Sequence, residues 1–451
     1  LIEKDTWRII SMYKINKVNS WNGWDPLKQV ILGNVFEPEF FEDLPNTKVR
    51  DSLQKLLYET HEDLNNIQKT LEELGVDVVR PHPNSTQYAY LYELGGEGDS
   101  TYTPKTIGEY IENNGGKNMK LHGGLPKPCL SPRDFFIVFG NKMLATQNSG
   151  SLNKFLSDSN QKMINPDCVD LRLTEEFNNK FYREWNGMEP FTMQELKNTK
   201  LTGPFKTRKK YVESKAFDNF DWGWFDEGTN HRFYHYDHFK NAMALTYGFW
   251  APQVTRVGDT LVVDTEEIEN LDKVILEMYP EFKMANTAIG GHNDGSFNLP
   301  KPGLCICTPW LSKEHFAHTL PGWEILRIDN PKPMSTDYEG YHSWENVKNA
   351  THGKYWMPGI EHDDMLRRFI DDWLGKWVGY AEETIFEVNM LSVNENTILS
   401  MNYQKEVNDK LKQHGIEPIY CRFRHRNFWD AGLHCLTVDT VRDGGKQNYF
   451  D

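Results

Sequence analysis

The sequence has no long hydrophobic run. Its 451 residues contain no stretch of about 18 consecutive apolar residues, the length that a membrane-spanning helix needs. We also recognise no secretory signal peptide. Apolar residues make up 38% of the chain and charged residues 25%, the balance of a soluble globular protein. We therefore expect a cytoplasmic protein without a membrane span.

Cysteine is scarce as well. The six residues are Cys129, Cys168, Cys305, Cys307, Cys421 and Cys435. Only Cys305 and Cys307 are close, and they alternate with apolar residues over 304–308, which favours two same-face positions of a strand over a zinc site. Scattered cysteines in a long chain are typical of reduced thiols in a reducing compartment.

Histidines at 231, 235 and 238 are close enough to suggest a metal cluster. They lie in an aromatic stretch without a helical frame, so we interpret that stretch as a solvated loop and expect no metal. The chain also contains no G-x-G-x-x-G after a strand and no phosphate loop, and we expect no organic cofactor.

Positive charge is in deficit. Lys and Arg number 50 against 65 Asp and Glu, which gives a net charge of −15. This balance excludes nucleic acid and anionic membranes as expected partners, because both require a cationic face. It is compatible with a small cationic substrate.

Short strands and helices alternate along the chain. Apolar residues recur at helical spacing over 49–74 and end at Gly75, between expected strands at 28–33 and 76–79. The sequence also predicts a hairpin of 135–139 and 142–145 over Gly140-Asn141. Further strands are expected at 260–263, 304–308, 323–328, 384–391, 397–401 and 418–422, with helices at 266–278 and 405–414. This order favours a repeated α/β module.

The domain organisation follows from composition. Residues 1–20 are polar and are interpreted as an N-terminal arm, and 21–451 as one domain. Three polar or Gly- and aromatic-rich stretches, at about 95–124, 206–240 and 329–362, are interpreted as insertions.

Cys435 is the candidate nucleophile. It follows a small-residue turn at Gly432 and precedes a strand-like run over 436–438, which suits close approach of a substrate. A cysteine reacts as the thiolate, so it needs a base or a cation nearby. The alternative is a buried structural thiol. His434 is a rival base, but adjacent strand positions face opposite sides, which favours His292.

His292 and Asp294 form a second candidate pair, flanked by glycines. In an extended segment their side chains would face the same side. Asp134 precedes the apolar strand 135–139 and could cap a turn or bind a cation. If Asp134 and Asp294 converge, they could bind a planar guanidinium through paired charge-assisted hydrogen bonds. A polar loop with a structural histidine is the alternative.

Four ordered segments resemble the amidinotransferase family, especially the glycine and inosamine-phosphate amidinotransferases. They are W-N-G-W-D-P-L with V-I-L-G at 21–33, P-R-D with G-N at 132–141, H-N-D-G-S-F-N at 292–298, and G-L-H-C-L-T-V-D at 432–439. The final Y-F-D at 449–451 also resembles a typical ending of the family. The order and rough spacing agree from about residue 20 to the end.

The resemblance implies a five-bladed, pseudo-symmetric α/β propeller, the pentein fold, and a homodimer. It implies that Cys435 attacks the guanidinium carbon of L-arginine while Asp134 and Asp294 hold the guanidinium. By the same resemblance, His292 protonates the departing amine, ornithine leaves, and an acceptor amine takes the amidino group from the cysteine.

The sequence departs from the family at two places. Trp250 stands where the resemblance expects the aspartate that orients the histidine, and Gln253 stands where it expects a second acid. On the acceptor side, Leu311 replaces an arginine and Glu382-Glu383 replace two serines, while Asn389 is kept. Glu382 and Glu383 are candidates to replace the lost acid or to favour an acceptor with an extra amine. We count Trp250, Gln253, Glu382, Glu383 and Asn389 among the expected substrate-binding residues.

Two other functions remain open. Water could resolve the covalent intermediate, which would make the protein a hydrolase that forms citrulline. Loss of the orienting acid could instead leave a guanidino-compound binding protein with little activity. We expect the transferase, because a binder has no need for a thiol beside a histidine and two carboxylates.

Overall fold

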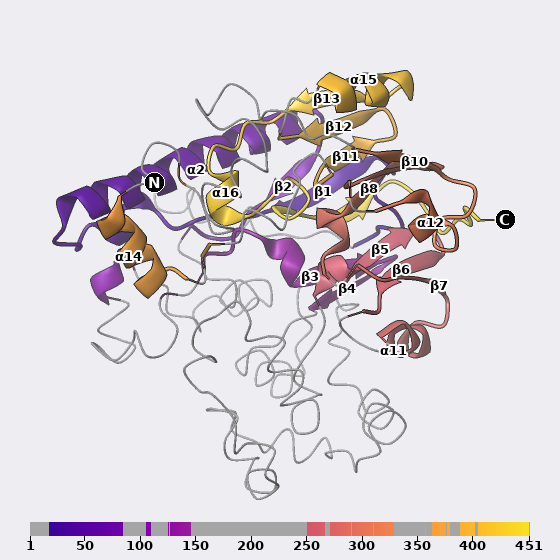
Figure 1. Ribbon diagram of the computed structural model, residues 1–451, viewed down its shortest axis with the longest axis horizontal. Helices are drawn as coiled ribbons and strands as arrows, with labels where there is room; N and C mark the ends of the chain where they lie inside the picture. Colours follow the sequence, from indigo (N-terminus) through magenta and orange to yellow (C-terminus); the bar gives the residue numbers. More distant parts are fainter. Residues whose placement is uncertain are drawn as a thin grey trace, which may run out of the picture.

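The computed structural model describes most of the chain outside its long insertions (Figure 1). The described residues are 18–83, 105–109, 125, 127–145, 250–266, 271–289, 291–309, 311–328, 357, 363–375, 377–378, 388–401 and 405–450. The predicted arm lies outside them apart from 18–20, and so do Glu382 and Glu383. The insertion at 206–240, with its three histidines, lies wholly outside, while 95–124 and 329–362 are described only at 105–109 and 357.

One module shows the repeating unit of the fold. Strands β5 (Val254–Val257) and β6 (Thr260–Asp264) form an antiparallel hairpin, and helix α11 (Leu271–Met278) leads to β7 (Lys283–Thr287), which pairs with β6 in parallel. Every residue of β6 is buried, as its apolar run T-L-V-V-D indicates. The hairpin turns at Gly258, where φ is +66° and a β-carbon would lie 2.1 Å from the carbonyl oxygen of Gln447, so glycine is required.

The same order of antiparallel and parallel pairing recurs. One sheet contains β8 (Phe297–Lys301), β9 (Leu304–Cys307) and, after α12 (Lys313–Phe316), β10 (Glu324–Arg327). The next sheet contains β11 (Leu391–Asn394), β12 (Thr397–Ser400) and, after α15 (Lys405–Gln413), β13 (Glu417–Tyr420). Figure 1 shows α15, α12 and α11 at the periphery, with the strands between them. The predicted repeat of an α/β module is confirmed.

The two ends of the chain complete another module. C-terminal β14 (Thr437–Arg442) pairs antiparallel with β1 (Leu27–Leu32), and helix α2 (Thr47–Glu73) leads from β1 to β2 (Asp77–Val79), which is parallel to it. The hairpin of β3 (Phe136–Phe139) and β4 (Lys142–Ala145) forms the fifth sheet of the described chain. The strand that follows Cys435 is thereby paired with an N-terminal strand.

The segment just before β1 forms isolated β-bridges to neighbouring sheets. Ser20 bridges to Gly140 at the β3–β4 turn, Asn22 bridges to Val257 of β5, and Asn19 bridges to Val441 of β14. One short segment therefore contacts three sheets, which fixes their strand ends relative to one another.

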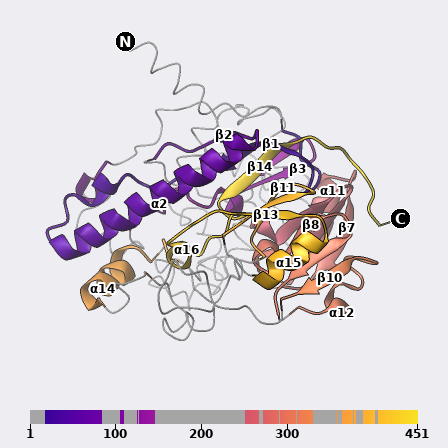
Figure 2. The same ribbon diagram turned by 90° about the horizontal axis from the view of Figure 1, so that it is seen from above.

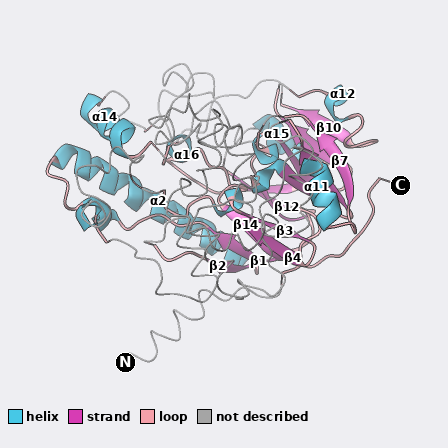
Figure 3. Ribbon diagram, turned by 90° about the horizontal axis from the view of Figure 1, so that it is seen from below, coloured by secondary structure: helices cyan, strands magenta, loops and turns pink. Residues whose placement is uncertain are grey.

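Helix α2 is the longest described helix. Asn46 caps it by accepting a hydrogen bond from the backbone of Val49, and Gly75 ends it with φ +81°. Its apolar face is buried in the core, as the spacing over 49–74 predicted. Figures 2 and 3 show α2 running from α14 (Asp364–Trp373) at one end toward β1 and β2 at the other. The short helices η1 (Pro38–Phe41) and α16 (Arg426–Trp429) complete this part.

Predicted boundaries differ from the structure at two places. Residues 388–390 form a turn, so the strand expected over 384–391 is wrong there, and 384–387 lie outside the described residues. The helix expected over 266–278 does not include 266 and is described over Leu271–Met278, while 267–270 lie outside the described residues. The hairpin at 135–145 and the helix at 405–414 are confirmed within one residue. The expected same-face placement of Cys305 and Cys307 is also confirmed, because both lie in one buried cluster while Leu304 and Ile306 lie in another.

Candidate functional site

The predicted site residues that the structure describes lie on or next to turns that occupy the same place in each module. Each turn directly precedes the first strand of its sheet: η3 (Pro132–Asp134) before β3, η7 (Ala251–Gln253) before β5, η8 (Asn293–Gly295) before β8, 388–390 before β11, and 433–436 before β14. Asn389 links two of the turns, since its Nδ2 donates to the carbonyl oxygen of Asp294 at 3.1 Å. The repeat thus gathers residues that are hundreds of positions apart in the sequence.

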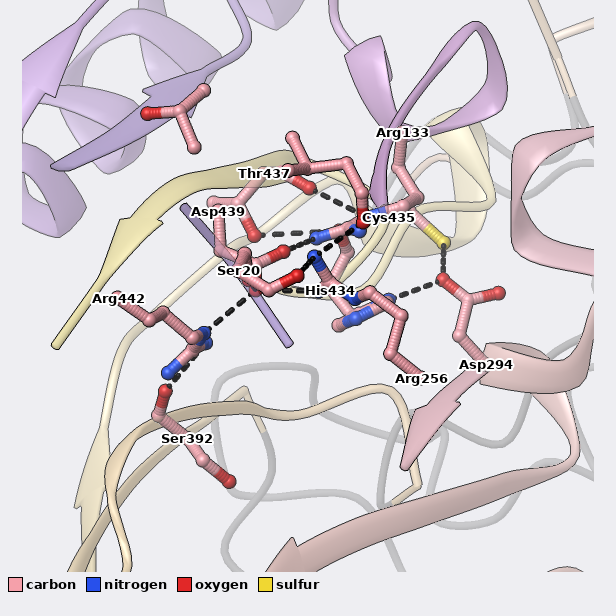
Figure 4. Close-up of polar contacts among 12 residues, drawn as sticks. Ser20, Arg133, Arg256, Asp294, Ser392, His434, Cys435, Thr437, Asp439 and Arg442 are labelled. Atoms are coloured by element: carbon pink, nitrogen blue, oxygen red, sulfur yellow. Dashed lines mark hydrogen bonds and ion pairs between the residues drawn. The ribbon is translucent and has the colours of Figure 1, made fainter. Parts of the chain in front are cut away.

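Cys435 lies at the centre of this arrangement. Its side chain is buried, with 6% of the residue exposed. Asn389 Nδ2 donates to Cys435 Sγ at 2.9 Å, and the sulfur lies 3.6 Å from Asp294 Oδ2 (Figure 4). Cys435 and Asp294, which are 141 positions apart, therefore lie in contact.

His434 also reaches Asp294, which corrects the reason for setting it aside. Residues 433–436 form a turn, and β14 begins only at Thr437, so the alternation of a strand does not apply to His434 and Cys435. His434 Nδ1 lies 2.7 Å from Asp294 Oδ2, the oxygen that the sulfur also approaches (Figure 4). Turn geometry allows two neighbouring side chains to meet one carboxylate.

Asp294 is a buried carboxylate with one oxygen still available. Burial opposes its ionisation, but the hydrogen bond and charge of His434, with the charges of His292 and Arg133, outweigh that and hold its pKa below the usual value. Its Oδ1 is buried and has no hydrogen-bond partner among the described residues. An unpaired buried acceptor is costly in a folded protein and is expected where a ligand supplies the donor.

The surroundings of His434 disfavour its cationic form. Burial and the charge of Arg133 lower the pKa of His434, and the hydrogen bond to Asp294 opposes that only in part. A neutral imidazole that faces an ionised carboxylate through Nδ1 carries its proton there, which leaves Nε2 as an acceptor. His434 therefore has the form of a base held in place by an acid.

His292 is placed differently from the expectation. The segment 293–295 is a 3-10 turn and His292 precedes it, so the extended arrangement predicted for His292 and Asp294 is wrong. The ring centroids of His292 and Trp250 are 5.6 Å apart. His292 has no hydrogen bond to a carboxylate within the described part of the chain. Its charge nevertheless helps to hold the pKa of Asp294 low.

The remaining predicted residues divide between the site and the scaffold. Trp250 packs its ring against His292 and lies 6.3 Å from Phe135. Gln253 is fully buried, and its Oε1 accepts a hydrogen bond from the backbone of Trp250 at 2.8 Å, which stabilises the turn. Asp134 lies close enough for its charge to act on Cys435.

The thiol of Cys435 is held in its protonated form in the empty site. Burial raises its pKa well above the usual value, and the charges of Asp294 and Asp134 raise it further. Hydrogen bonds from the Gly432 backbone and from Asn389 oppose the rise. A cation bound between the two carboxylates would offset their charges and favour the thiolate.

A buried cluster of charged residues connects the turns of the site. Asp439 of β14 accepts hydrogen bonds from Arg133 at 2.7 Å, Arg256 at 2.6 Å and Arg442 at 2.6 Å (Figure 4). Arg133 also donates to the carbonyl oxygen of Thr437 at 2.9 Å. Arg133 directly precedes Asp134 in η3, and Asp439 lies in the strand that follows Cys435. The cluster therefore fixes η3 and the turn at 433–436 relative to each other.

The sequence motifs include two of these residues without a role for either. Arg133 stands in P-R-D and Asp439 at the end of the cysteine motif, while Arg256 lies outside the four segments. Arginine and aspartate inside apolar runs were the available signal, since charged residues are rarely buried unless they are paired. Only the structure shows which of these arginines and aspartates pair with one another.

Within the described ranges, no group of three or more His, Cys, Asp or Glu side chains could hold a metal ion. The described helices likewise include none that is long and apolar enough to cross a bilayer.

Comparison with known proteins finds similarity among solved structures. No protein-family model matches the chain, and no curated protein matches it. The chain is similar to the inosamine-phosphate amidinotransferase STRB1 from Streptomyces griseus, with 15% identity and a TM-score of 0.48 over 96% of this chain and 99% of that chain. It is similar to SxtG, an amidinotransferase from Microseira wollei in a saxitoxin biosynthetic pathway, with 16% identity and a TM-score of 0.48 over 96% of this chain and 100% of that one.

A third similar structure is an agmatine deiminase of C. jejuni, with 12% identity and a TM-score of 0.40 over 95% of this chain and 97% of that chain. Identities this low assign no substrate to the present chain. Two of these three similar structures are named as amidinotransferases.

Proposed function

We propose that this protein is an amidinotransferase that moves the amidino group of L-arginine to an acceptor amine through a covalent intermediate on Cys435. The observation that carries the proposal is the free oxygen of Asp294. This Oδ1 is buried without a described hydrogen-bond partner, and the other oxygen of the same carboxylate lies 3.6 Å from the Cys435 sulfur. A planar cation that donates to Oδ1 would bring its central carbon close to the thiol.

Electrostatics favour a guanidinium over a neutral group. Asp294 is ionised, and Asp134 contributes a second negative charge near the sulfur. A guanidinium presents parallel N–H donors in a plane, which suits carboxylates that converge from two turns. Binding of the cation would also lower the cost of forming the thiolate, so the substrate would help to activate its own nucleophile.

The reaction then proceeds in two halves. His292 accepts the proton of the Cys435 thiol. The thiolate forms a bond to the guanidinium carbon, and the bond from that carbon to the side-chain nitrogen of arginine breaks. His292 gives the proton to that nitrogen, and ornithine leaves. In the second half His292 removes a proton from the acceptor amine, which attacks the amidino carbon and releases the thiolate.

His434 is a second candidate for the acid–base role. Its Nδ1 is held 2.7 Å from Asp294 Oδ2, whereas the contact of His292 is the ring of Trp250. A carboxylate that fixes the tautomer and orientation of a histidine makes it a better base. His434 therefore offers a carboxylate–histidine pair in a chain where Trp250 takes the place expected for the orienting acid.

The acceptor is proposed to be an amine other than glycine. Glu382 and Glu383 stand where two serines are expected, and two acids would repel a carboxylate-bearing acceptor while favouring one with an extra amine. Competition between glycine, lysine, diamines and aminosugars tests this. Glycine as the best acceptor would count against it.

We also propose that the five sheets form the five-bladed propeller of the pentein fold, and that the protein is a cytoplasmic homodimer. Four sheets that share one pairing order, and a sheet closed by both chain ends, support the propeller. Size-exclusion chromatography with light scattering tests the dimer, and a mass of one chain would contradict it.

The direct test of function is intact-mass spectrometry after incubation with L-arginine. We expect the mass of one amidino group on the wild-type chain and none on Cys435→Ala. Cys421→Ala is a matched control, because Cys421 is similarly buried, with 5% exposed against 6% for Cys435. Its adduct should form normally.

The products separate the remaining alternatives. Ornithine and a guanidino compound support the transferase, whereas citrulline and ammonia would assign a hydrolase. Binding of arginine with no adduct and no turnover would leave only a binding protein.

A further inference from the structure

We propose that Asn389 is a positioning residue for the nucleophile: it holds the Cys435 sulfur and donates a hydrogen bond to the thiolate, and it does not bind substrate. This inference rests on the proposed function in one respect, that Cys435 is the nucleophile. It replaces the expectation from sequence that Asn389 contacts the substrate.

All the hydrogen-bonding capacity of Asn389 is used within the protein. Its Oδ1 accepts from the backbone N–H of His434 at 2.9 Å and of Cys435 at 3.1 Å. Its Nδ2 donates to the carbonyl oxygen of Asp294 at 3.1 Å and to Cys435 Sγ at 2.9 Å. An amide has two acceptor positions and two donor hydrogens, so no position is left for a ligand.

The partners fix which way the amide faces. The N–H groups of His434 and Cys435 can only donate, so they must face the amide oxygen, and the carbonyl oxygen of Asp294 can only accept, so it must face the NH2. The remaining N–H therefore points at the sulfur. Rotating the amide by 180° would lose all three backbone bonds.

Packing holds Asn389 in this position. The residue is fully buried. A β-carbon at Gly432 would lie 2.3 Å from Asn389 Oδ1 and 2.4 Å from its Cβ, so the turn before Cys435 closes directly on this side chain. Gly432 is thus needed for contact between the two turns. From the sequence, this glycine had been related to substrate approach.

The charges around the sulfur show why such a donor is needed. Asp294 from η8 and Asp134 from η3 both oppose the thiolate, while the pKa of His434 on the same turn is lowered and Arg133 is engaged by Asp439. A hydrogen bond to an ionised acceptor is roughly twice as strong as one to a neutral acceptor, so the Asn389 N–H favours the thiolate over the thiol. It offsets part of the opposing effect of the carboxylates.

The test is the pH dependence of Cys435 alkylation by iodoacetamide, followed by peptide mass spectrometry. Asn389→Asp keeps the shape of the side chain and an acceptor for the two backbone N–H groups, but exchanges the donor for an oxygen. We expect alkylation at neutral pH to slow by about 10- to 100-fold and the pH midpoint to rise by about one to two units. Asn389→Ala should raise the midpoint in the same direction.

Asn34→Asp is the matched control. Asn34 is also buried, and its Nδ2 donates to a backbone carbonyl oxygen, that of Pro81, at 2.9 Å. Its alkylation profile should match wild type. Thermal unfolding of each variant separates loss of the fold from loss of the donor, because a purely structural role would lower the rate without moving the midpoint.

The unaltered protein gives a second readout. With selective ¹⁵N labelling of asparagine, the side-chain resonance of Asn389 should titrate together with the alkylation of Cys435. An unchanged pH midpoint in folded Asn389→Asp, or an Asn389 resonance that does not follow the thiol, would overturn the inference. Alkylation measures the thiol and not turnover, so failure of amidino transfer would leave this result standing.

Discussion

Replacing Asp439 by asparagine should destabilise the protein strongly. The Asp439 carboxylate is 2% exposed and accepts from three arginine side chains that are 2–5% exposed, at 2.6–2.7 Å. Asparagine keeps one oxygen, but its NH2 would face guanidinium donors, and three buried cations would lose their counter-charge. Removing one partner from a buried ion pair costs about 3–5 kcal/mol, and we expect a loss of unfolding free energy in that range.

The matched control is Asp443→Asn. Asp443 pairs with Lys28 at 3.9 Å, and their side chains are 74% and 52% exposed. Exposed pairs contribute about 0–1 kcal/mol, so this variant should resemble wild type. Denaturant unfolding followed by fluorescence measures both variants. Equal stabilities for the two variants would refute the idea that the buried cluster holds the turns together.

The pH dependence of this effect has a defined sign. Burial opposes ionisation of Asp439, but Arg256, Arg442 and Arg133 outweigh it and hold its pKa well below the usual value. A carboxylate whose folded pKa is depressed contributes its full stabilisation above its unfolded pKa of about 3.9 and loses it as the pH falls through the folded value. The difference between wild type and Asp439→Asn should therefore stay constant from about pH 5 to pH 8.

Three further predictions concern the site. Gly432→Ala places a β-carbon 2.3 Å from Asn389 Oδ1, so it should destabilise the fold by about 1–3 kcal/mol and slow alkylation of Cys435; normal alkylation would show that the contact is not needed. His292→Gln should slow ornithine release by about 100-fold or more, as expected for loss of an acid–base group. His434→Gln should mainly raise the KM for arginine, because Asp294 loses the partner that keeps its pKa low. The reverse pattern in steady-state kinetics would assign acid–base catalysis to His434.

The sequence was most informative about elements whose signal is local. Helix α2 was predicted because its apolar spacing and the terminating Gly75 lie within one segment. The hairpin over Gly140-Asn141 was predicted for the same reason. The strand expected at 384–391 was wrong at 388–390, since these residues form a turn that carries Asn389.

The sequence also identified candidate reactive residues of the site. A cysteine after a glycine turn, and aspartates at 134 and 294 near strand starts, identified side chains that do lie on corresponding turns. Residue type and position before a strand carry that information, because a turn at the mouth of a strand exposes its side chains to the same end of the sheet.

What only the tertiary structure decided is which groups face one another. His434 was set aside because strand alternation was assumed, yet a turn brings it to within 2.7 Å of Asp294. Asn389 was expected to bind substrate, yet its four hydrogen bonds end on the protein and on the sulfur. The physical reason is that the orientation of a side chain depends on turn dihedrals and on contacts between modules far apart in the chain. The sequence alone gives only the residue types that each module contains.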